Sequence, residues 1–478
     1  MVDIGLIIPE TTLLVLACCV LLVDVFRSPN APGVTFWAAV ISSLIVLAQL
    51  AYYFPDGSYI AFSGQVKVDA MGAVLKSFVM VLSLLSMFYA RDYFDKRNER
   101  ASEFYLLTLF ATLGMVVLIS AGSLLTVYLG LELLSLSLYS LVAMRRNSAA
   151  SSEAAMKYFI LGAIASGMLL YGMSMLYGVT GTLELERLAN ASQLIGKGKL
   201  LLVFGIVFVV VGIAFKVGVV PFHMWLPDVY QGSSAPVTLF IGSAPKLAAF
   251  AMAIRVLVEG VPTLSNDWHA MLIILAVLSM ALGNIVAIAQ TNIKRMLAYS
   301  TIAHMGFMLL GIIAATAAGY AASMFYVIIY ALMSMGAFGA VILLSNASSE
   351  AEMLDDFRGL AKRSPWFGFI ILVIIFSLAG IPPFAGFWAK WYVLKEVVDA
   401  GHIWLAAVAV FFSIIGAYYY LRVMKLMYFD DPTDTSNLVA TPDLKLVLSV
   451  NGLAVFLLGV LPGALMAVCV VVTLPYSG

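Results

Sequence analysis

Four charged residues lie inside segments that are otherwise apolar and long enough to cross a bilayer: Glu132, Lys216, Lys246 and Lys390. A charged side chain in hydrocarbon costs roughly 3 kcal/mol or more, so such residues by default mark a route for protons or ions. Glu132 lies about ten residues, or ~15 Å, from either end of its segment, which is too deep for its carboxylate to reach water. It therefore needs a cationic partner or a proton, and a purely structural ion pair would also meet that need.

Lysine is better suited than arginine to carry a proton, because a buried lysine can release its proton whereas arginine stays charged. Movement of Glu132 toward or away from Lys216 would switch that lysine between holding and releasing a proton. Three further residues are candidates for the same pathway. His304 could pass protons near neutral pH, although a histidine packed in the core would fit the pattern equally well. Lys157 could gate the pathway or anchor a helix at the membrane interface.

His223 is a weaker candidate, because Trp225 and Asp228 nearby indicate an approaching membrane interface.

The composition places these residues in a membrane protein. Of the 478 residues 63% are hydrophobic and only 11% are charged, far from the balance of soluble domains. The formal net charge of zero argues against a nucleic-acid partner. The three cysteines, Cys18, Cys19 and Cys469, cannot supply an iron–sulfur or zinc site, and no phosphate-binding glycine motif is present. We therefore expect the chain to bind no metal or cofactor and to perform no redox chemistry.

Apolar stretches of ~20 residues predict fourteen transmembrane helices and an all-α membrane protein. We expect them at 4–26, 33–54, 70–90, 102–120, 123–143, 156–178, 200–226, 236–258, 268–290, 296–316, 320–345, 366–398, 402–428 and 445–473. Basic residues fall mainly in alternate connections: Arg27, Arg91, Lys96, Arg97, Arg100, Arg145, Arg146, Lys294, Arg295, Arg358, Lys362, Arg363 and Lys445, against Lys67, Arg187, Lys197 and Lys199. Because basic loops stay cytoplasmic, both termini are expected outside.

Internal similarity predicts two inverted five-helix repeats. Residues 163–166 resemble 331–334, and Gly212-Ile213 resembles Gly380-Ile381, at the same separation of 168 positions (331 − 163 and 380 − 212). Glycine and proline interrupt the seventh helix after Lys216 and the twelfth before Lys390, and such breaks expose backbone groups to an ion pathway or simply kink a helix. We expect an N-terminal three-helix segment at 1–100, repeats at 101–260 and 261–430, and a C-terminal helix at 431–478.

Two blocks of sequence carry a family resemblance. Phe215-Lys216 followed by 221–230, 235–237 and Pro245-Lys246, together with 294–306, resembles the antiporter-type membrane subunits of proton-pumping NADH:quinone oxidoreductase, respiratory complex I. The resemblance extends over most of the chain. It implies a bacterial inner-membrane protein that crosses the bilayer many times and translocates protons. NADH, FMN, iron–sulfur clusters and quinone would then be bound by partner subunits, next to other membrane-arm subunits and lipid.

The resemblance also implies residue roles. Glu132 would pair with Lys216, Lys246 would be the central relay, Lys390 would serve the other half-channel, and Lys157 and His304 would lie on the same polar axis. The family is also similar to subunits of cation/proton antiporters and membrane-bound hydrogenases, so an antiporter subunit is the alternative function. A third interpretation, a structural scaffold, predicts that neutralising the buried charges leaves proton pumping intact.

Overall fold

A computed structural model describes residues 2–26, 33–97, 99, 101–193, 199–432, 438 and 440–476. Arg27, Arg100 and Lys197, three of the loop residues on which the predicted topology depends, lie outside these residues. The described chain divides into two compact units. Unit 1 comprises residues 1–87, 100–217 and 244–271, and unit 2 comprises residues 88–99, 218–243 and 272–478.

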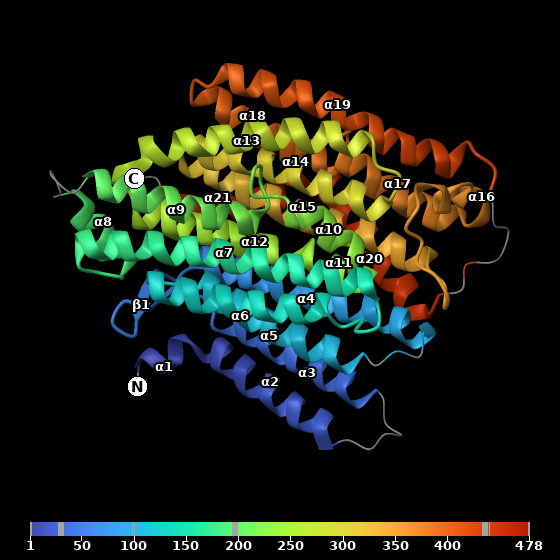
Figure 1. Cartoon of the computed structure of the whole chain (residues 1–478), viewed down its shortest axis with the longest axis horizontal. Coiled ribbons are helices and arrows are strands. Elements are labelled where there is room, and N and C mark those ends of the chain that lie inside the picture. Colours follow the sequence, from blue (N-terminus) through green and yellow to red (C-terminus); the bar gives the residue numbers. More distant parts are fainter. Residues whose placement is uncertain are drawn as a thin grey trace. The chain divides into compact units, whose positions relative to one another are not determined.

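Unit 1 is built mainly from long apolar helices. Its elements are α1 (Val2–Leu6), α2 (Ile8–Phe26), α3 (Val34–Tyr52), β1 (Tyr59–Ala61), β2 (Val66–Val68), most of α4 (Ala70–Arg97), α5 (Ser102–Ile119), α6 (Leu124–Val142), α7 (Ala149–Thr180), α8 (Leu185–Gln193), α9 (Lys199–Val217), α12 (Ala244–Ala253), the π-helix η1 (Ile254–Gly260), the 3-10 turn η2 (Pro262–Leu264) and the start of α13 (Ser265–Ile288). Helices α7 and α9 lie alongside one another, as do α5 and α6 (Figure 1).

Close helix packing in unit 1 depends on glycine. A Cβ atom on Gly114 of α5 would lie 2.5 Å from the backbone nitrogen of Leu134 in α6, so only glycine allows this approach. On α7, a Cβ atom on Gly172 would lie 2.6 Å from the Gly205 carbonyl oxygen of α9. These contacts bring α6 and α9, which carry Glu132 and Lys216, into well-packed positions. Outside the helices, β1 and β2 form an antiparallel hairpin.

Unit 2 contains the remaining helices. They are α10 (Trp225–Gly232), α11 (Ala235–Ile241), α14 (Ile293–Ile313), α15 (Ala317–Leu344), η3 (Leu354–Phe357), α16 (Leu360–Arg363), α17 (Pro365–Ala379), α18 (Ala385–Asp399), α19 (Ile403–Tyr428), α20 (Pro442–Val460), α21 (Pro462–Thr473) and η4 (Leu474–Tyr476). Helix α15 is almost entirely buried and contacts α11, α14, α17, α18, α20 and α21, so it forms the centre of this unit.

The described residues contain thirteen helices long and apolar enough to cross a membrane. Each corresponds to one of the fourteen predicted spans, and the remaining prediction, 366–398, is the broken pair α17 and α18. The all-α membrane fold is thus confirmed. The predicted fourteenth span is also interrupted, because α20 ends at Val460 and α21 begins at Pro462. The sixth span begins at Ala149 rather than at 156, since the Ser148 hydroxyl caps its N-terminus by accepting from the Ser151 amide.

Both predicted helix breaks are present, and their backbones match. Helix α9 ends at Val217 and is followed by Gly218 with φ of 88°, while α17 ends at Ala379 and is followed by Gly380 with φ of 83°. These left-handed conformations favour glycine. By this criterion the equivalent of Gly380 is Gly218, at a separation of 162 positions (380 − 218), and not Gly212, which lies inside α9. The predicted repeat and domain boundaries remain a prediction.

Candidate functional site

The first group of candidate residues lies in unit 1, where α6 faces α9. The Lys216 Nζ atom donates a hydrogen bond to the Ser135 hydroxyl at 2.6 Å, and Ser135 follows Glu132 by one turn of α6. The Oε1 atom of Glu132 is buried and has no hydrogen-bond partner among the described residues. The opposite charges of Glu132 and Lys216 attract one another. Lys216 therefore contacts Ser135, the pairing of Lys216 with Glu132 remains a prediction, and Glu132 retains a free acceptor for a proton.

Lys246 lies elsewhere in unit 1, on α12, and is almost completely buried. Its Nζ atom donates to the carbonyl oxygen of Val217 at 3.0 Å. Val217 is the last residue of α9, and the helix break leaves its carbonyl without an intrahelical amide partner. The lysine thus supplies the hydrogen bond that the missing turn of α9 would have made.

Lys390 makes the same kind of contact in unit 2. Its Nζ atom donates to the carbonyl oxygen of Ala379, the last residue of α17, at 2.9 Å and to the Ser413 hydroxyl of α19 at 2.9 Å. The ammonium group also lies 5.2 Å from the centre of the Phe307 ring. A Cβ atom on Gly380 would lie 2.9 Å from the lysine side chain, so the glycine leaves room for it.

The two carbonyl contacts reveal a correspondence that the sequence did not. Val217 and Ala379 are separated by the same 162 positions (379 − 217) as the two positive-φ glycines. By its contact, Lys390 is therefore the counterpart of Lys246, whereas Lys216 contacts a serine hydroxyl and is attracted by the charge of Glu132. Lysine is held against each helix break by different elements, α12 in one unit and α18 in the other.

His304 is surrounded by hydroxyl groups in unit 2. Its Nδ1 atom lies 2.7 Å from the Tyr326 hydroxyl and its Nε2 atom lies 3.1 Å from the Tyr420 hydroxyl. Tyr420 continues to Ser300 at 2.5 Å. The Tyr330 ring lies 5.1 Å from the imidazole. Both ring nitrogens are therefore engaged with groups that can donate or accept a proton, and the charge of Lys390 also acts on the ring.

Lys157 lies on a partly exposed face of α7. Its side chain is 44% exposed and forms an ion pair with Glu153, one turn earlier on the same helix, at 2.8 Å. His223 lies in the connection between α9 and α10, where its Nδ1 atom is buried and has no hydrogen-bond partner among the described residues. The roles predicted for both residues remain predictions.

Comparison with known proteins identifies the family. The model of the membrane region shared by NADH:quinone oxidoreductase and Mrp antiporters matches residues 121–416. The chain is 53% identical to NADH-quinone oxidoreductase subunit N of Thiobacillus denitrificans, over 97% of this chain and 96% of that one. The chain belongs to the subunit N family of NADH:quinone oxidoreductase. Subunit N of Thioalkalivibrio sulfidiphilus is also 53% identical, over 96% of each chain.

Solved structures agree with this family. A chain of respiratory complex I from Thermus thermophilus is 33% identical, with a TM-score of 0.82, over 96% of this chain and 99% of that one. A chain of the Mrp complex from Dietzia shares the fold, with a TM-score of 0.86 at 20% identity, over 98% of this chain and 96% of that one. The predicted resemblance is confirmed, and within that family the segment 228–232 favours subunit N, in agreement with these relatives. Like its bacterial relatives, the chain is a multi-pass inner-membrane protein.

Several buried charged residues of this family member were not among the predicted site residues. Arg255, in the π-helix η1, donates both terminal nitrogens to Asp69, at 2.6 and 2.7 Å, and one of them to Glu259 at 2.6 Å. Burial would raise the pKa of Asp69, yet the guanidinium of Arg255 holds that pKa well below its usual range. In α4, Lys76 forms a buried ion pair with Glu10 at 2.5 Å.

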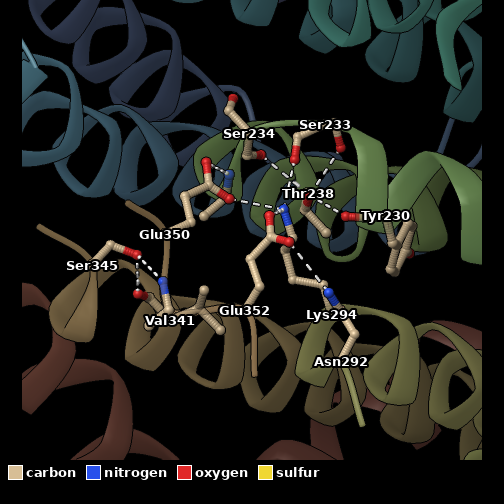
Figure 2. A network of polar contacts seen from close by, with 12 residues as sticks. Tyr230, Ser233, Ser234, Thr238, Asn292, Lys294, Val341, Ser345, Glu350 and Glu352 are labelled. Atoms are coloured by element: carbon tan, nitrogen blue, oxygen red, sulfur yellow. Dashed lines mark hydrogen bonds and ion pairs between the residues drawn. The ribbon is translucent and has the colours of Figure 1, made fainter. Parts of the chain in front are cut away.

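A third buried group, in unit 2, is the Lys294 cluster, consisting of Lys294, Glu350 and Glu352. Figure 2 shows the Lys294 side chain reaching between the two carboxylates, with its Nζ atom 2.8 Å from an oxygen of each. The same Nζ atom donates to the Ser233 carbonyl at 2.9 Å. None of the described residues forms a group of three histidine, cysteine or acidic side chains suited to a metal ion.

Proposed function

We propose that this chain is a proton-translocating membrane subunit of NADH:quinone oxidoreductase, in which other subunits carry electrons from NADH to quinone. The observation that carries the proposal is the pair of buried lysines, Lys246 and Lys390, each placed against the last carbonyl of a broken helix. A carbonyl oxygen stabilises an ammonium group but leaves the lysine free to lose its proton, because the amine that remains can still donate a hydrogen bond.

Each unit supplies its own set of proton-transfer groups. In unit 1, Lys216 contacts Ser135 and is attracted by the charge of Glu132, and Lys246 contacts the last carbonyl of α9. In unit 2, Lys390 lies near His304, whose two nitrogens contact tyrosine hydroxyls. A charge moved against 100 mV costs about 2.3 kcal/mol. A change of ~3 units in a lysine pKa between two conformations is worth about 4 kcal/mol, which is enough to drive that step.

We further propose that the chain itself binds no flavin, nicotinamide, iron–sulfur cluster or metal, and that its partners are the other membrane-arm subunits, lipid and the transported protons. The three cysteines are all free; Cys18 and Cys19 are exposed on α2, and Cys469 is buried in α21. The alternative, a subunit of a cation/proton antiporter, is less favoured because the curated relatives that match the full chain bear the name of the oxidoreductase.

The test is replacement of Lys390 in the assembled complex. Lys390→Ala should reduce NADH-driven proton pumping by inverted membrane vesicles by roughly a hundredfold, because a positioned proton-transfer group typically contributes that much or more. NADH oxidation by a soluble electron acceptor should be unchanged. The matched control is Lys395→Ala on the same helix, since Lys395 is 55% exposed and pairs with Asp399. Normal pumping in an assembled Lys390→Ala complex would contradict the proposal, and sodium-dependent pumping would favour the antiporter alternative.

A further inference from the structure

In the Lys294 cluster, the buried ammonium group of Lys294 contacts two carboxylates, one partly exposed and one buried. The side chain of Glu352 is 34% exposed, that of Lys294 is 0% exposed and that of Glu350 is 5% exposed. Lys294 Nζ is 2.8 Å from an oxygen of each glutamate. A proton arriving from water at Glu352 therefore has a hydrogen-bonded route to Glu350 that passes through one atom.

The backbone holds the cluster in place. The segment after α15 that carries both glutamates pairs with the start of α14, because the Ile293 amide donates to the Glu352 carbonyl at 2.7 Å and the Leu354 amide donates to the Thr291 carbonyl at 3.0 Å. The Asn292 side chain also donates to the Glu352 carboxylate at 3.3 Å. The two carboxylates are thus fixed relative to the amine, as proton transfer requires.

Other charged and titratable groups face Glu350 from the elements packed around it. The hydroxyl of Tyr93, on α4, donates to Glu350, and the guanidinium of Arg97 lies over the Tyr93 ring at 3.9 Å. The amide of Ala235 donates to the same carboxylate at 3.4 Å. The charges of Arg97 and Glu99 act on Glu350 from the end of α4. Nearby, Asp92 pairs with Lys96 and Asp228 pairs with Arg295.

The cluster also lies at the N-terminus of α14, the helix that carries His304. Lys294 is in the first turn of α14, ten residues or about 15 Å along the axis from His304. Thr301, two turns after Lys294 and on the same side of the helix, accepts a hydrogen bond from Tyr330 at 2.6 Å. The Tyr330 ring in turn lies 5.1 Å from the His304 ring. Lys294 and Thr301 thus lie on one side of α14, and the hydrogen bond from Tyr330 joins Thr301 to the surroundings of His304.

We propose that the Lys294 cluster is the proton-loading site of unit 2. Glu352 takes a proton from water, Lys294 gives a proton from Nζ to Glu350, and the protonated Glu352 then restores the proton on Lys294. One N–H bond breaks as one O–H bond forms in each transfer, and no electron is moved. Glu350 is left protonated inside the protein, as the donor for groups along α14. This inference rests on the function proposed above.

The test uses the complete complex in inverted membrane vesicles. Glu350→Gln should lower the rate of proton pumping by roughly tenfold or more at alkaline pH, because it removes a positioned proton acceptor. The ratio of its rate to the wild-type rate should rise as the pH falls, since protons become more available. Lys294→Arg keeps the positive charge but cannot pass a proton, so it should be impaired as well. The control is Asp355→Asn in the same segment, where Asp355 is 67% exposed and pairs with Arg358.

Several outcomes would overturn the loading site. Wild-type pumping by assembled Glu350→Gln and Lys294→Arg complexes would do so. A loss that is the same at every pH, or full recovery of pumping in Lys294→Arg, would indicate a structural role instead. If Glu350→Gln does not assemble, the half-exposed Glu352→Gln provides the same comparison. Lys390→Ala in parallel separates the two proposals, because pumping that is lost there but normal in Glu350→Gln refutes only the loading site.

Discussion

Substitution of Lys246 separates its role as a proton carrier from its role in the structure. Lys246→Met removes the ammonium group and leaves the Val217 carbonyl without this donor, at a cost of about 1–3 kcal/mol. It also removes a buried charge, whose desolvation penalises the folded state by several kcal/mol. The two effects oppose one another, so the complex should assemble and its thermal midpoint should change little. Proton pumping should fall by roughly a hundredfold, equivalent to about 2.7 kcal/mol of activation free energy.

Lys246→Arg separates loss of the hydrogen bond to Val217 from loss of proton release. Arginine can still donate to the Val217 carbonyl, so the contact that closes the end of α9 is kept, but arginine does not release its proton. Both variants should therefore fail to pump, as measured by fluorescence quenching of a pH probe in vesicles, while NADH oxidation by a soluble acceptor continues. Lys199→Met, at the exposed start of α9, is the control. Near-normal pumping by Lys246→Arg would refute the titrating-lysine mechanism, because a fixed charge would then suffice.

Three further predictions address other parts of the molecule. Lys216→Arg should assemble but pump at a rate roughly a hundredfold below wild type in the same vesicle assay, and unimpaired pumping would exclude proton release by Lys216. Asp69→Asn should lower the thermal midpoint of the purified complex, by about 1.5–3 kcal/mol in stability, because Arg255 loses its bidentate carboxylate partner and retains Glu259 as its counter-charge. The folded pKa of Asp69 is depressed, so this difference should be complete at neutral pH and shrink below about pH 4; a constant difference would argue against the ion pair. Single cysteines at Arg146 and Arg187 should be labelled from opposite sides of the membrane, and labelling from one side would contradict the predicted topology.

Much of the fold follows from local sequence properties. Apolar length alone predicts the spans, and glycine with proline predicts both breaks, because these residues act on their own turn of backbone. The charges of Glu132, Lys216, Lys246 and Lys390 stand out for the same reason. What these charges contact depends on packing between distant segments, so neither the Val217 carbonyl nor the Ser135 hydroxyl could be assigned from sequence.

Two further charged residues meet the same criterion of lying inside an apolar span. Lys76 and Arg255 lie inside predicted spans, at 70–90 and 236–258, just as Lys246 does. From its sequence position Lys294 indicates only a basic loop that reports topology, and Glu350 lies in a connection with no periodic pattern. The position of Lys294 between two carboxylates arises because the chain returns to the start of α14 after the 28-residue helix α15, a pairing that local spacing does not encode.

The carbonyl contacts of Lys246 and Lys390 bear on how many protons each site can store. A peptide oxygen carries a negative partial charge but does not itself become protonated in the working pH range. A lysine that contacts such an oxygen can therefore hold only one exchangeable proton at that site. Lys216 differs because the charge of Glu132 acts on it, and these two residues together have two titrating groups. Each lysine held against a helix end would then carry one proton per cycle, whereas groups that include a carboxylate, such as Glu132 with Lys216 or the Lys294 cluster, could hold a second proton.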